Sequence, residues 1–154
     1  MTAFTVIASL ELSGRARSGS GLFSWIAKLP WNDPSFATQT LAMLIFAFDG
    51  VGGIINASYG VDLVVHNTLW IVGHFHLTVG AAVALSFIGI TYWLVPHLTG
   101  KALWSARAAR FQVWTFLLGM VTFSASHHFL GFRYGVPRRT MLGTAPYLSP
   151  KWHS

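Results

Sequence analysis

Three long apolar stretches alternate with polar segments along the chain. They cover residues 36–65, 69–95 and 111–130, and an α-helix needs about 20 apolar residues to cross a lipid bilayer. A shorter apolar run, residues 4–10, is too short to cross and is interpreted as the end of a further helix. The pattern therefore predicts an all-α transmembrane bundle in one domain, with three full spans and the end of a fourth.

Turn-forming residues mark the breaks between these stretches. Residues 11–34 are polar and rich in Gly, Ser and Pro, and Pro30 and Pro34 favour a firm stop. Residues 96–110 form a second polar segment, and Gly-Val-Pro at 135–137 ends the third stretch. We expect loops at each of these places, and a further loop at residues 146–154.

The composition supports a membrane protein rather than a soluble one. Of 154 residues, 53% are hydrophobic and 9% are charged, whereas soluble domains carry about 25% charged residues. The basic residues fall in separate loop clusters, so no nucleic-acid surface is predicted. Cysteine is absent, which excludes disulfides and thiolate-bound metals. Any metal chemistry must then depend on the seven histidines.

Loop charges predict an orientation in the membrane. Basic side chains occupy the segments before the first span and after the second, namely Arg15, Arg17, Lys28, Lys101, Arg107 and Arg110. Because cytoplasmic loops are enriched in Lys and Arg, both segments are expected on the cytoplasmic side. The segment after the third span then faces outward although it carries further arginines. A local negative group would explain them, and haem propionates are one candidate.

The residues His74 and His76 lie well inside the second apolar stretch. Residues two apart on a helix differ by about 200° in direction, so these imidazoles point to opposite faces and cannot share one metal. A helix between two cofactors would need this arrangement, and haem accepts a single axial imidazole on each side. The alternative is a pair of histidines that only make polar contacts within a bundle. Ionisable residues at this depth are usually functional.

Polar residues also occupy the two segments expected on the outer side. Asp62, His66 and Asn67 could form a hydrogen-bonding cluster over cofactor carboxylates, or Asn67 or Thr68 could simply cap the next helix. Arg138 and Arg139 could bind propionates through charge-assisted hydrogen bonds. They could equally extend to lipid headgroups.

Two further polar positions interrupt apolar stretches. Asp49 suggests a proton path or a polar cavity; alternatively it lies beside a small pocket of water, or it is protonated. The adjacent residues His127 and His128 could be copper ligands, but their position in the third stretch favours a packing or interface role.

The residues 66–77, His-Asn-Thr-Leu-Trp-Ile-Val-Gly-His-Phe-His-Leu, resemble subunit I of the haem–copper oxidases, and the B-type, ba3-like branch most closely. The likeness continues in order through Ala-Ser-Leu-Glu at 8–11, Gly-Leu-Phe at 21–23, Gly-Gly-Ile-Ile-Asn-Ala-Ser at 52–58 and Gly-Val-Pro-Arg-Arg at 135–139. A lone His-x-His would be weak evidence, whereas an ordered series is specific. The resemblance implies that the chain is a C-terminal-half fragment of a twelve-helix-type oxidase core.

The resemblance implies a role for each histidine of the His-Phe-His motif. His74 would be the proximal ligand of the high-spin, oxygen-binding haem and hence the catalytic residue. His76 would be an axial ligand of the low-spin haem, and Phe75 would lie beside the electron path between them. Copper is expected in the intact subunit, but the family's copper ligands lie upstream of this region and are absent here.

The resemblance also places the outer polar residues near haem propionates. Asp62, His66 and Asn67 would lie near those of the high-spin haem, and Arg138 and Arg139 near those of the low-spin haem. Where A-type relatives have an aspartate that helps to hold magnesium, this chain has Asn67, so no magnesium site is predicted.

The resemblance implies part of a terminal respiratory oxidase that reduces oxygen to water and translocates protons. Cytochrome c is the expected electron donor, and other oxidase subunits, including a CuA-type subunit II, are the expected partners together with membrane lipid. The expected location is a prokaryotic plasma membrane, as an integral multi-pass protein. The alternatives are a nitric oxide reductase-type subunit, a stand-alone bis-histidine haem protein, or a non-functional remnant.

Overall fold

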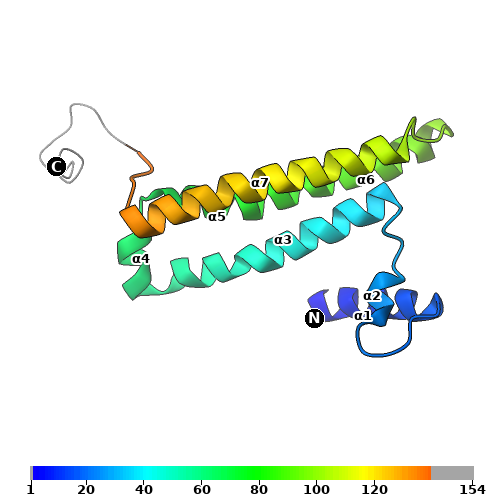
Figure 1. The fold of residues 1–154 in the computed structure, drawn as a ribbon, viewed down its shortest axis with the longest axis horizontal. Helices are drawn as coiled ribbons and strands as arrows, with labels where there is room; N and C mark the ends of the chain where they lie inside the picture. Colours follow the sequence, from blue (N-terminus) through cyan, green and yellow to red (C-terminus); the bar gives the residue numbers. More distant parts are fainter. Residues whose placement is uncertain (1, 140–154) are drawn as a thin grey trace, which may run out of the picture.

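Long helices that run side by side form the body of the molecule (Figure 1). The structure is a computed structural model that describes residues 2–139. The first long helix is α3 (Pro34–Ala57), and the second is a continuous rod of α5 (Leu69–Phe75), the π-helical segment η1 (His76–Ala81) and α6 (Ala82–Thr99). The third is α7 (Ala106–Tyr134). The predicted all-α fold is confirmed over the described residues, while the loop predicted at residues 146–154 lies outside them.

Much of the apolar surface of this bundle is not covered by the chain itself. Among the described residues, two helices are long and apolar enough to cross a membrane, Pro34–Ala57 and Leu69–Thr99. Helix α7 has 29 residues, which is enough length, but it is less apolar than the other two. On α3, Phe48 and Ile54 are 72% and 70% exposed. Side chains of this kind suit contact with lipid or with neighbouring helices.

The first apolar stretch holds two helices where the hydrophobic pattern predicted one. Helix α3 ends at Ala57 and the short helix α4 (Tyr59–Val65) follows at the end of the bundle (Figure 1). Ser58, which has an extended backbone, separates them. Its N–H bonds to the carbonyl of Ile54 and its own carbonyl accepts from Asp62. Ser58 therefore gives a hydrogen-bond partner to a carbonyl at the end of α3 and to an N–H at the start of α4.

The first helix is longer than the apolar run that predicted it. Helix α1 (Thr2–Ala16) continues into the polar segment, where Arg15 and Glu11 form an ion pair of 2.7 Å one helical turn apart. Such pairs stabilise a helix that apolar patterning does not reveal. The helix is followed by Ser18 with a positive φ of 69°, and then by the one-turn helix α2 (Ser24–Ala27).

Side-chain caps begin the three long helices. The carboxylate of Asp33 accepts from the N–H of Ser35 at 3.0 Å, directly before Pro34 in the first turn of α3. The hydroxyl of Thr68 accepts from Trp70 at 3.2 Å, and that of Ser105 accepts from Ala108 at 3.2 Å. Each cap satisfies an N–H that has no partner within its helix.

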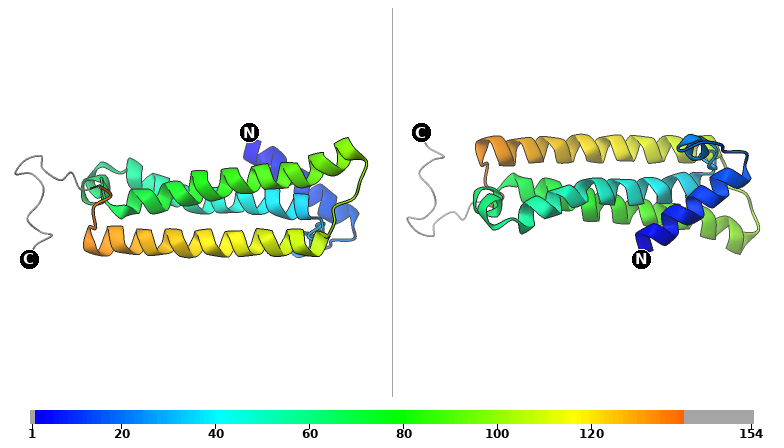
Figure 2. Two further views of the ribbon diagram at one scale, coloured as in Figure 1. Left: turned by 90° about the horizontal axis from the view of Figure 1, so that it is seen from above. Right: turned by 90° about the horizontal axis from the view of Figure 1, so that it is seen from below.

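The polar segments divide between the two ends of the bundle, as the views in Figure 2 show. At one end, Arg110 Nη1 donates to Asn32 Oδ1 at 2.6 Å and joins the two basic segments. At the other end, the N–H of Arg138 donates to the carbonyl of Asn67 at 2.6 Å, next to a β-bridge between Thr68 and Pro137. The basic segments thus share one end, which the charge-based orientation requires.

Small residues allow the helices to approach closely. A Cβ atom added to Gly131 on α7 would collide with the backbone nitrogen of Trp70 on α5. Across α3 and α6, Ser35 Oγ donates to the carbonyl of Gly89 at 2.7 Å. Glycine and serine at such positions are typical of membrane helix interfaces.

The contact between α5 and α7 can be tested at glycine positions of α7. We expect Gly131→Ala to lower the thermal stability of the detergent-solubilised protein, because overpacking costs about 1–3 kcal/mol and the backbone of Trp70 cannot move away as a flexible side chain would. Gly119→Ala is the matched control, since no atom lies within 4 Å of its added Cβ. Equal melting temperatures for both variants would contradict the close packing described here.

Candidate functional site

A buried carboxylate faces the first histidine of the His-Phe-His motif. Asp49, on α3, is 5% exposed. Its Oδ2 lies 3.0 Å from Nδ1 of His74, which projects from the last turn of α5. Isolated charges are costly inside a bundle, so the position of Asp49 depends on this partner and on a second one.

The second partner comes from the third long helix. His128, on α7, has its Nε2 3.6 Å from Oδ1 of Asp49 and its Nδ1 3.2 Å from the hydroxyl of Ser124. Ser124 is fully buried and donates to the carbonyl of Gly73 at 2.6 Å. Because that hydroxyl hydrogen is already used, Nδ1–H of His128 is the donor to Ser124. These side chains, Asp49, His74, Ser124 and His128, are called the Asp49 cluster below.

The Asp49 cluster brings ionisable groups together without aligned hydrogen bonds between them. Asp49 Oδ2, His74 Nδ1 and His128 Nε2 are buried, and none has a hydrogen bond of acceptable geometry. Buried polar atoms are rarely left in this state, and such groups frequently mark functional sites. Among the described residues, no group of three or more His, Cys, Asp or Glu side chains is arranged to hold a metal ion.

His76 occupies a different environment from His74. It is exposed and begins the π-helical segment η1, a rare helix form that occurs frequently at functional sites. Its Nδ1 lies 2.8 Å from the carbonyl of Val72, and its ring lies 4.9 Å from that of Phe123 on α7. His74 thus faces α3 and His76 lies beside α7, in agreement with the different directions expected from their spacing.

The nitrogen atoms of these two histidines fit axial ligation of haem. In each ring Nδ1 contacts the protein, and within the described residues Nε2 has no hydrogen-bond partner. A metal-binding histidine usually has its other nitrogen engaged in this way. His128 differs because both its nitrogens contact the cluster. His127 also has Nδ1 bound to a backbone carbonyl. A bound Nδ1 therefore permits a histidine to ligate haem iron, but it does not single out which histidines do so.

The polar residues predicted near propionates lie together at one end of the bundle. Asp62, on α4, has its Oδ2 3.3 Å from Nδ1 of His66, the residue that follows the helix, and Asn67 comes next with a positive φ of 60°. The backbone of Arg138 is bonded to Asn67. Arg138 and Arg139 are exposed, and within the described chain neither side chain has an ion-pair partner. Thr68, rather than Asn67, caps α5.

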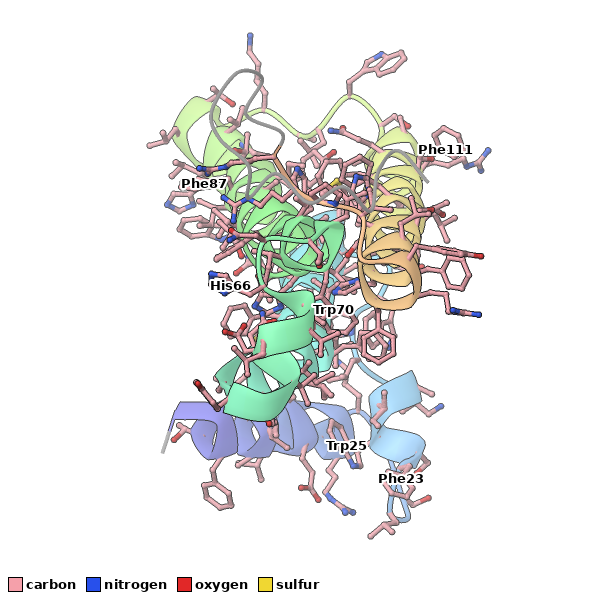
Figure 3. All side chains as sticks on the ribbon, turned by 90° about the vertical axis from the view of Figure 1, so that its left-hand side faces the viewer. Phe23, Trp25, His66, Trp70, Phe87 and Phe111 are labelled. Atoms are coloured by element: carbon pink, nitrogen blue, oxygen red, sulfur yellow. The ribbon has the colours of Figure 1, made fainter. Side chains whose placement is uncertain are left out.

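Figure 3 looks along the bundle from this end and shows Trp70 between α5 and α7, while His66 lies outside. The Trp70 ring meets that of His128 edge-on at 4.5 Å between centroids. Its Nε1 donates to Asn56 Oδ1 on α3 at 2.8 Å. Trp70 therefore separates the Asp49 cluster from the polar end of the bundle.

Sequence reasoning did not place Ser124, Trp70 or His128 with the motif histidines. A signal was present, because Ser124, His128 and Gly131 are spaced four and three residues apart and share one face of α7. A small or polar stripe on an apolar helix indicates an interface with another helix. Which helix it meets is not contained in the spacing.

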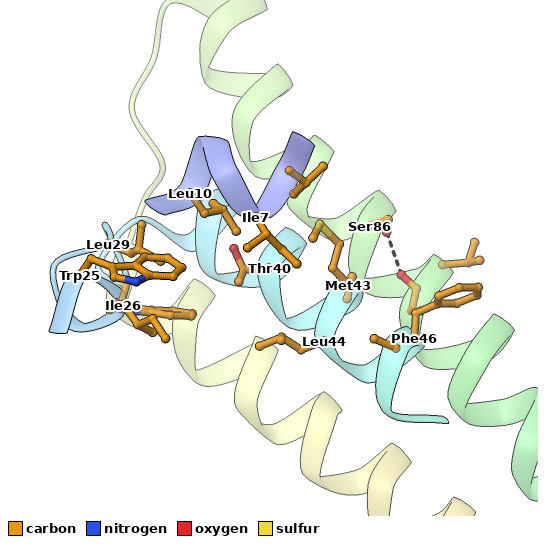
Figure 4. A pocket seen from close by; sticks show the side chains of 16 residues that line it. Ile7, Leu10, Trp25, Ile26, Leu29, Thr40, Met43, Leu44, Phe46 and Ser86 are labelled. Carbon is orange, nitrogen blue, oxygen red and sulfur yellow. Dashed lines mark hydrogen bonds between the residues drawn. The ribbon is translucent and has the colours of Figure 1, made fainter. Parts of the chain in front are cut away.

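A cavity of about 630 Å³ lies away from these residues, between α1, α2, α3 and α6 (Figure 4). Its lining is largely apolar and includes Ile7, Trp25, Leu29 and Met43. It contains none of the predicted haem ligands, so it is not the candidate site.

Comparison with known protein families identifies the family of this chain. Residues 1–153 match the family described as cytochrome c and quinol oxidase polypeptide I. The chain belongs to this family. The predicted resemblance to the haem–copper oxidases is thereby confirmed, and members of this oxidase family are integral membrane proteins that use haem and copper and act with other oxidase subunits.

Relatives with known names match most of this chain. It is 48% identical over 152 residues to cytochrome c oxidase subunit 1 of Thermus thermophilus, covering 97% of this chain and 27% of that protein. It is 32% identical to cytochrome c oxidase polypeptide 1 of Halobacterium salinarum, covering 77% and 20%. A solved haem–copper terminal oxidase dimer superposes with a TM-score of 0.81 at 36% identity, covering 98% and 28%. The chain thus spans about a quarter of the length of these relatives.

The hydrogen bonds of Ser124 can be tested against a second serine of the same helix. We expect Ser124→Ala to reduce stability by about 1 kcal/mol, because it removes the bond to Gly73 and leaves Nδ1 of His128 without an acceptor. Ser126→Ala is the control, since Ser126 is exposed and bonds only to its own helix, and exposed substitutions usually fall within about 0.5 kcal/mol. Thermal unfolding in detergent measures the stability of both variants. A loss of stability in Ser124→Ala no larger than that in Ser126→Ala would refute the role of the buried hydrogen bond.

Proposed function

We propose that this chain forms part of the catalytic subunit of a terminal respiratory oxidase and provides axial ligands to two haems. The observation that carries the proposal is the arrangement of His74 and His76. They lie two residues apart in one membrane-capable helix, have Nδ1 within 3.0 Å (His74) and 2.8 Å (His76) of an oxygen atom of the chain, and have Nε2 without a partner among the described residues. The family membership supports it.

His74 is the proposed proximal ligand of the high-spin haem and the catalytic residue. When bound, this haem supplies the iron at which oxygen is reduced to water. The chain's contribution is to fix the imidazole so that Nε2 is available, through the contact of Nδ1 with Asp49 and the close approach of α3. Copper belongs to the proposed intact oxidase, but its ligands are not identified among the residues of this chain.

His76 is the proposed axial ligand of the low-spin haem. Its backbone contact at Val72 fixes the tautomer with hydrogen on Nδ1, because a carbonyl only accepts. The ring therefore presents the lone pair of Nε2 outward from η1. Phe75 is 53% exposed between the two ligands, which agrees with a place beside an electron path from the low-spin to the high-spin haem.

The polar end of the bundle is the proposed propionate-binding region. Asp62, His66 and Asn67 are assigned to the high-spin haem, and Arg138 and Arg139 to the low-spin haem. Support comes from their position at one end, where the backbone bond between Arg138 and Asn67 brings both groups together. The exposed guanidinium groups are available for charge-assisted hydrogen bonds.

The proposed reaction requires partners outside the chain. Oxygen is the proposed substrate, cytochrome c the proposed electron donor, and a CuA-type subunit II the proposed neighbour in a prokaryotic plasma membrane. The relatives are named cytochrome c oxidases, which favours oxygen reduction coupled to proton translocation over the nitric oxide reductase alternative.

Removing His74 tests the high-spin assignment. In the assembled oxidase, we expect His74→Ala to abolish carbon monoxide binding and to spare the low-spin haem spectrum, because only the high-spin iron loses its ligand. Difference spectra of the reduced protein with and without carbon monoxide measure the effect. A variant that binds carbon monoxide normally would refute the assignment of His74.

Removing His76 tests the low-spin assignment. We expect His76→Ala to eliminate the low-spin absorption band, since a low-spin haem requires both axial ligands. His127→Ala is the control, because His127 shares the bond of Nδ1 to a backbone carbonyl but lies on α7. An unchanged low-spin band in His76→Ala, or its loss in the control, would contradict the assignment.

A further inference from the structure

Asp49 stands directly behind the proposed ligand of the high-spin haem. We propose that Asp49 is a positioning residue for this haem, and that its carboxylate holds Nδ1 of His74 while Nε2 binds the iron. This inference rests on the proposed function of His74 and extends it to a residue on a different helix.

The geometry supports a dedicated contact. Oδ2 of Asp49 and Nδ1 of His74 are 3.0 Å apart, with both side chains largely buried at 6% and 13% exposure. The distance is that of a hydrogen bond, but the ring N–H does not point along it, so both atoms remain unsatisfied. The χ2 angle of histidine is soft, and a small turn of the ring satisfies both atoms together.

The neighbouring glycines show how closely this contact is built. A Cβ atom on Gly52 would lie 3.0 Å from Nδ1 of His74 and 3.1 Å from Oδ1 of Asp49, against the contact itself. A Cβ on Gly53 would lie 3.6 Å from Cε1 and 3.9 Å from Nε2 of His74, at ordinary contact distances. Space at Gly52 is thus reserved for the meeting of carboxylate and imidazole.

The cluster also fixes the carboxylate from its other side. Oδ1 of Asp49 faces Nε2 of His128 at 3.6 Å, and His128 is held by Ser124, which is bonded to the backbone just before His74. The carboxylate therefore lies between helices α5 and α7, with one oxygen facing each of them.

A carboxylate in this position changes how the His74 imidazole acts as an iron ligand. A hydrogen bond from Nδ1–H to a negative oxygen fixes the tautomer and ring orientation and raises the basicity of the ligating nitrogen. Hydrogen bonding around an axial ligand is one of the protein's means of setting haem potential. A more basic imidazole strengthens the iron–nitrogen bond and favours the oxidised iron, so Asp49 should lower the potential of the high-spin haem.

Asp49→Asn in the assembled oxidase tests the proposal, because it keeps the shape and removes the charge. We expect the iron–histidine stretching band of the reduced high-spin haem to move to lower frequency and its midpoint potential to rise. The low-spin haem should be unchanged, and turnover should fall by about 10- to 100-fold, as is usual when an outer-shell partner is lost. A fully loaded high-spin haem with band and potential at wild-type values would overturn the proposal.

A pair of glycine variants tests the contact between Asp49 and His74 if the Asp49→Asn oxidase does not assemble. Gly52→Ala keeps the Asp49 side chain but displaces the carboxylate and the imidazole by a few tenths of an ångström. Because this disturbs their contact, the band should again move to lower frequency. Gly50→Ala is the control and should leave the band unchanged, because no atom lies within 4 Å of its added Cβ. Identical bands in both glycine variants and the wild type would refute the contact.

The His74→Ala variant separates failure of this inference from failure of the proposed function. If His74→Ala retains carbon monoxide binding, His74 is not the high-spin ligand and the proposed function fails with it. If His74→Ala loses carbon monoxide binding while Asp49→Asn leaves the band unchanged, the ligand assignment stands and the role of Asp49 alone is refuted.

Discussion

The rest of the structure depends on a carboxylate buried where three apolar helices meet. A charge inside such a bundle is tolerated only with close polar partners, and Asp49 finds them on α5 and α7. Asp49, His74 and His128 therefore lie at one level of the bundle, where α3, α5 and α7 meet. Close approach is then made possible by small residues, Gly73 and Gly131, whose added Cβ atoms would strike the facing helix.

The same constraint gives the two motif histidines different roles. His74 is turned inward against a charged group on another helix, whereas His76 bonds to the backbone of its own helix and stays exposed at the start of η1. Two imidazoles separated by one residue therefore differ in electrostatic surroundings. For a subunit proposed to hold an electron-transferring and an oxygen-reducing haem, such a difference allows the two potentials to be set separately.

The bundle also keeps its two ends chemically distinct. One end is joined by the bond between Arg110 and Asn32, among the basic segments. The other gathers acidic, imidazole and guanidinium groups where the backbone of Arg138 meets Asn67. Trp70, which bonds to α3 and contacts α7, lies between this polar end and the Asp49 cluster.

The sequence by itself determined the apolar helices and the different directions of His74 and His76, because these follow from local periodicity. It did not reveal the break at Ser58, since apolar residues continue on both sides of it. The association of Asp49 with His74 and His128 was decided only by the tertiary structure. Those residues are far apart in the chain, and no local pattern specifies which faces of separate helices pack together.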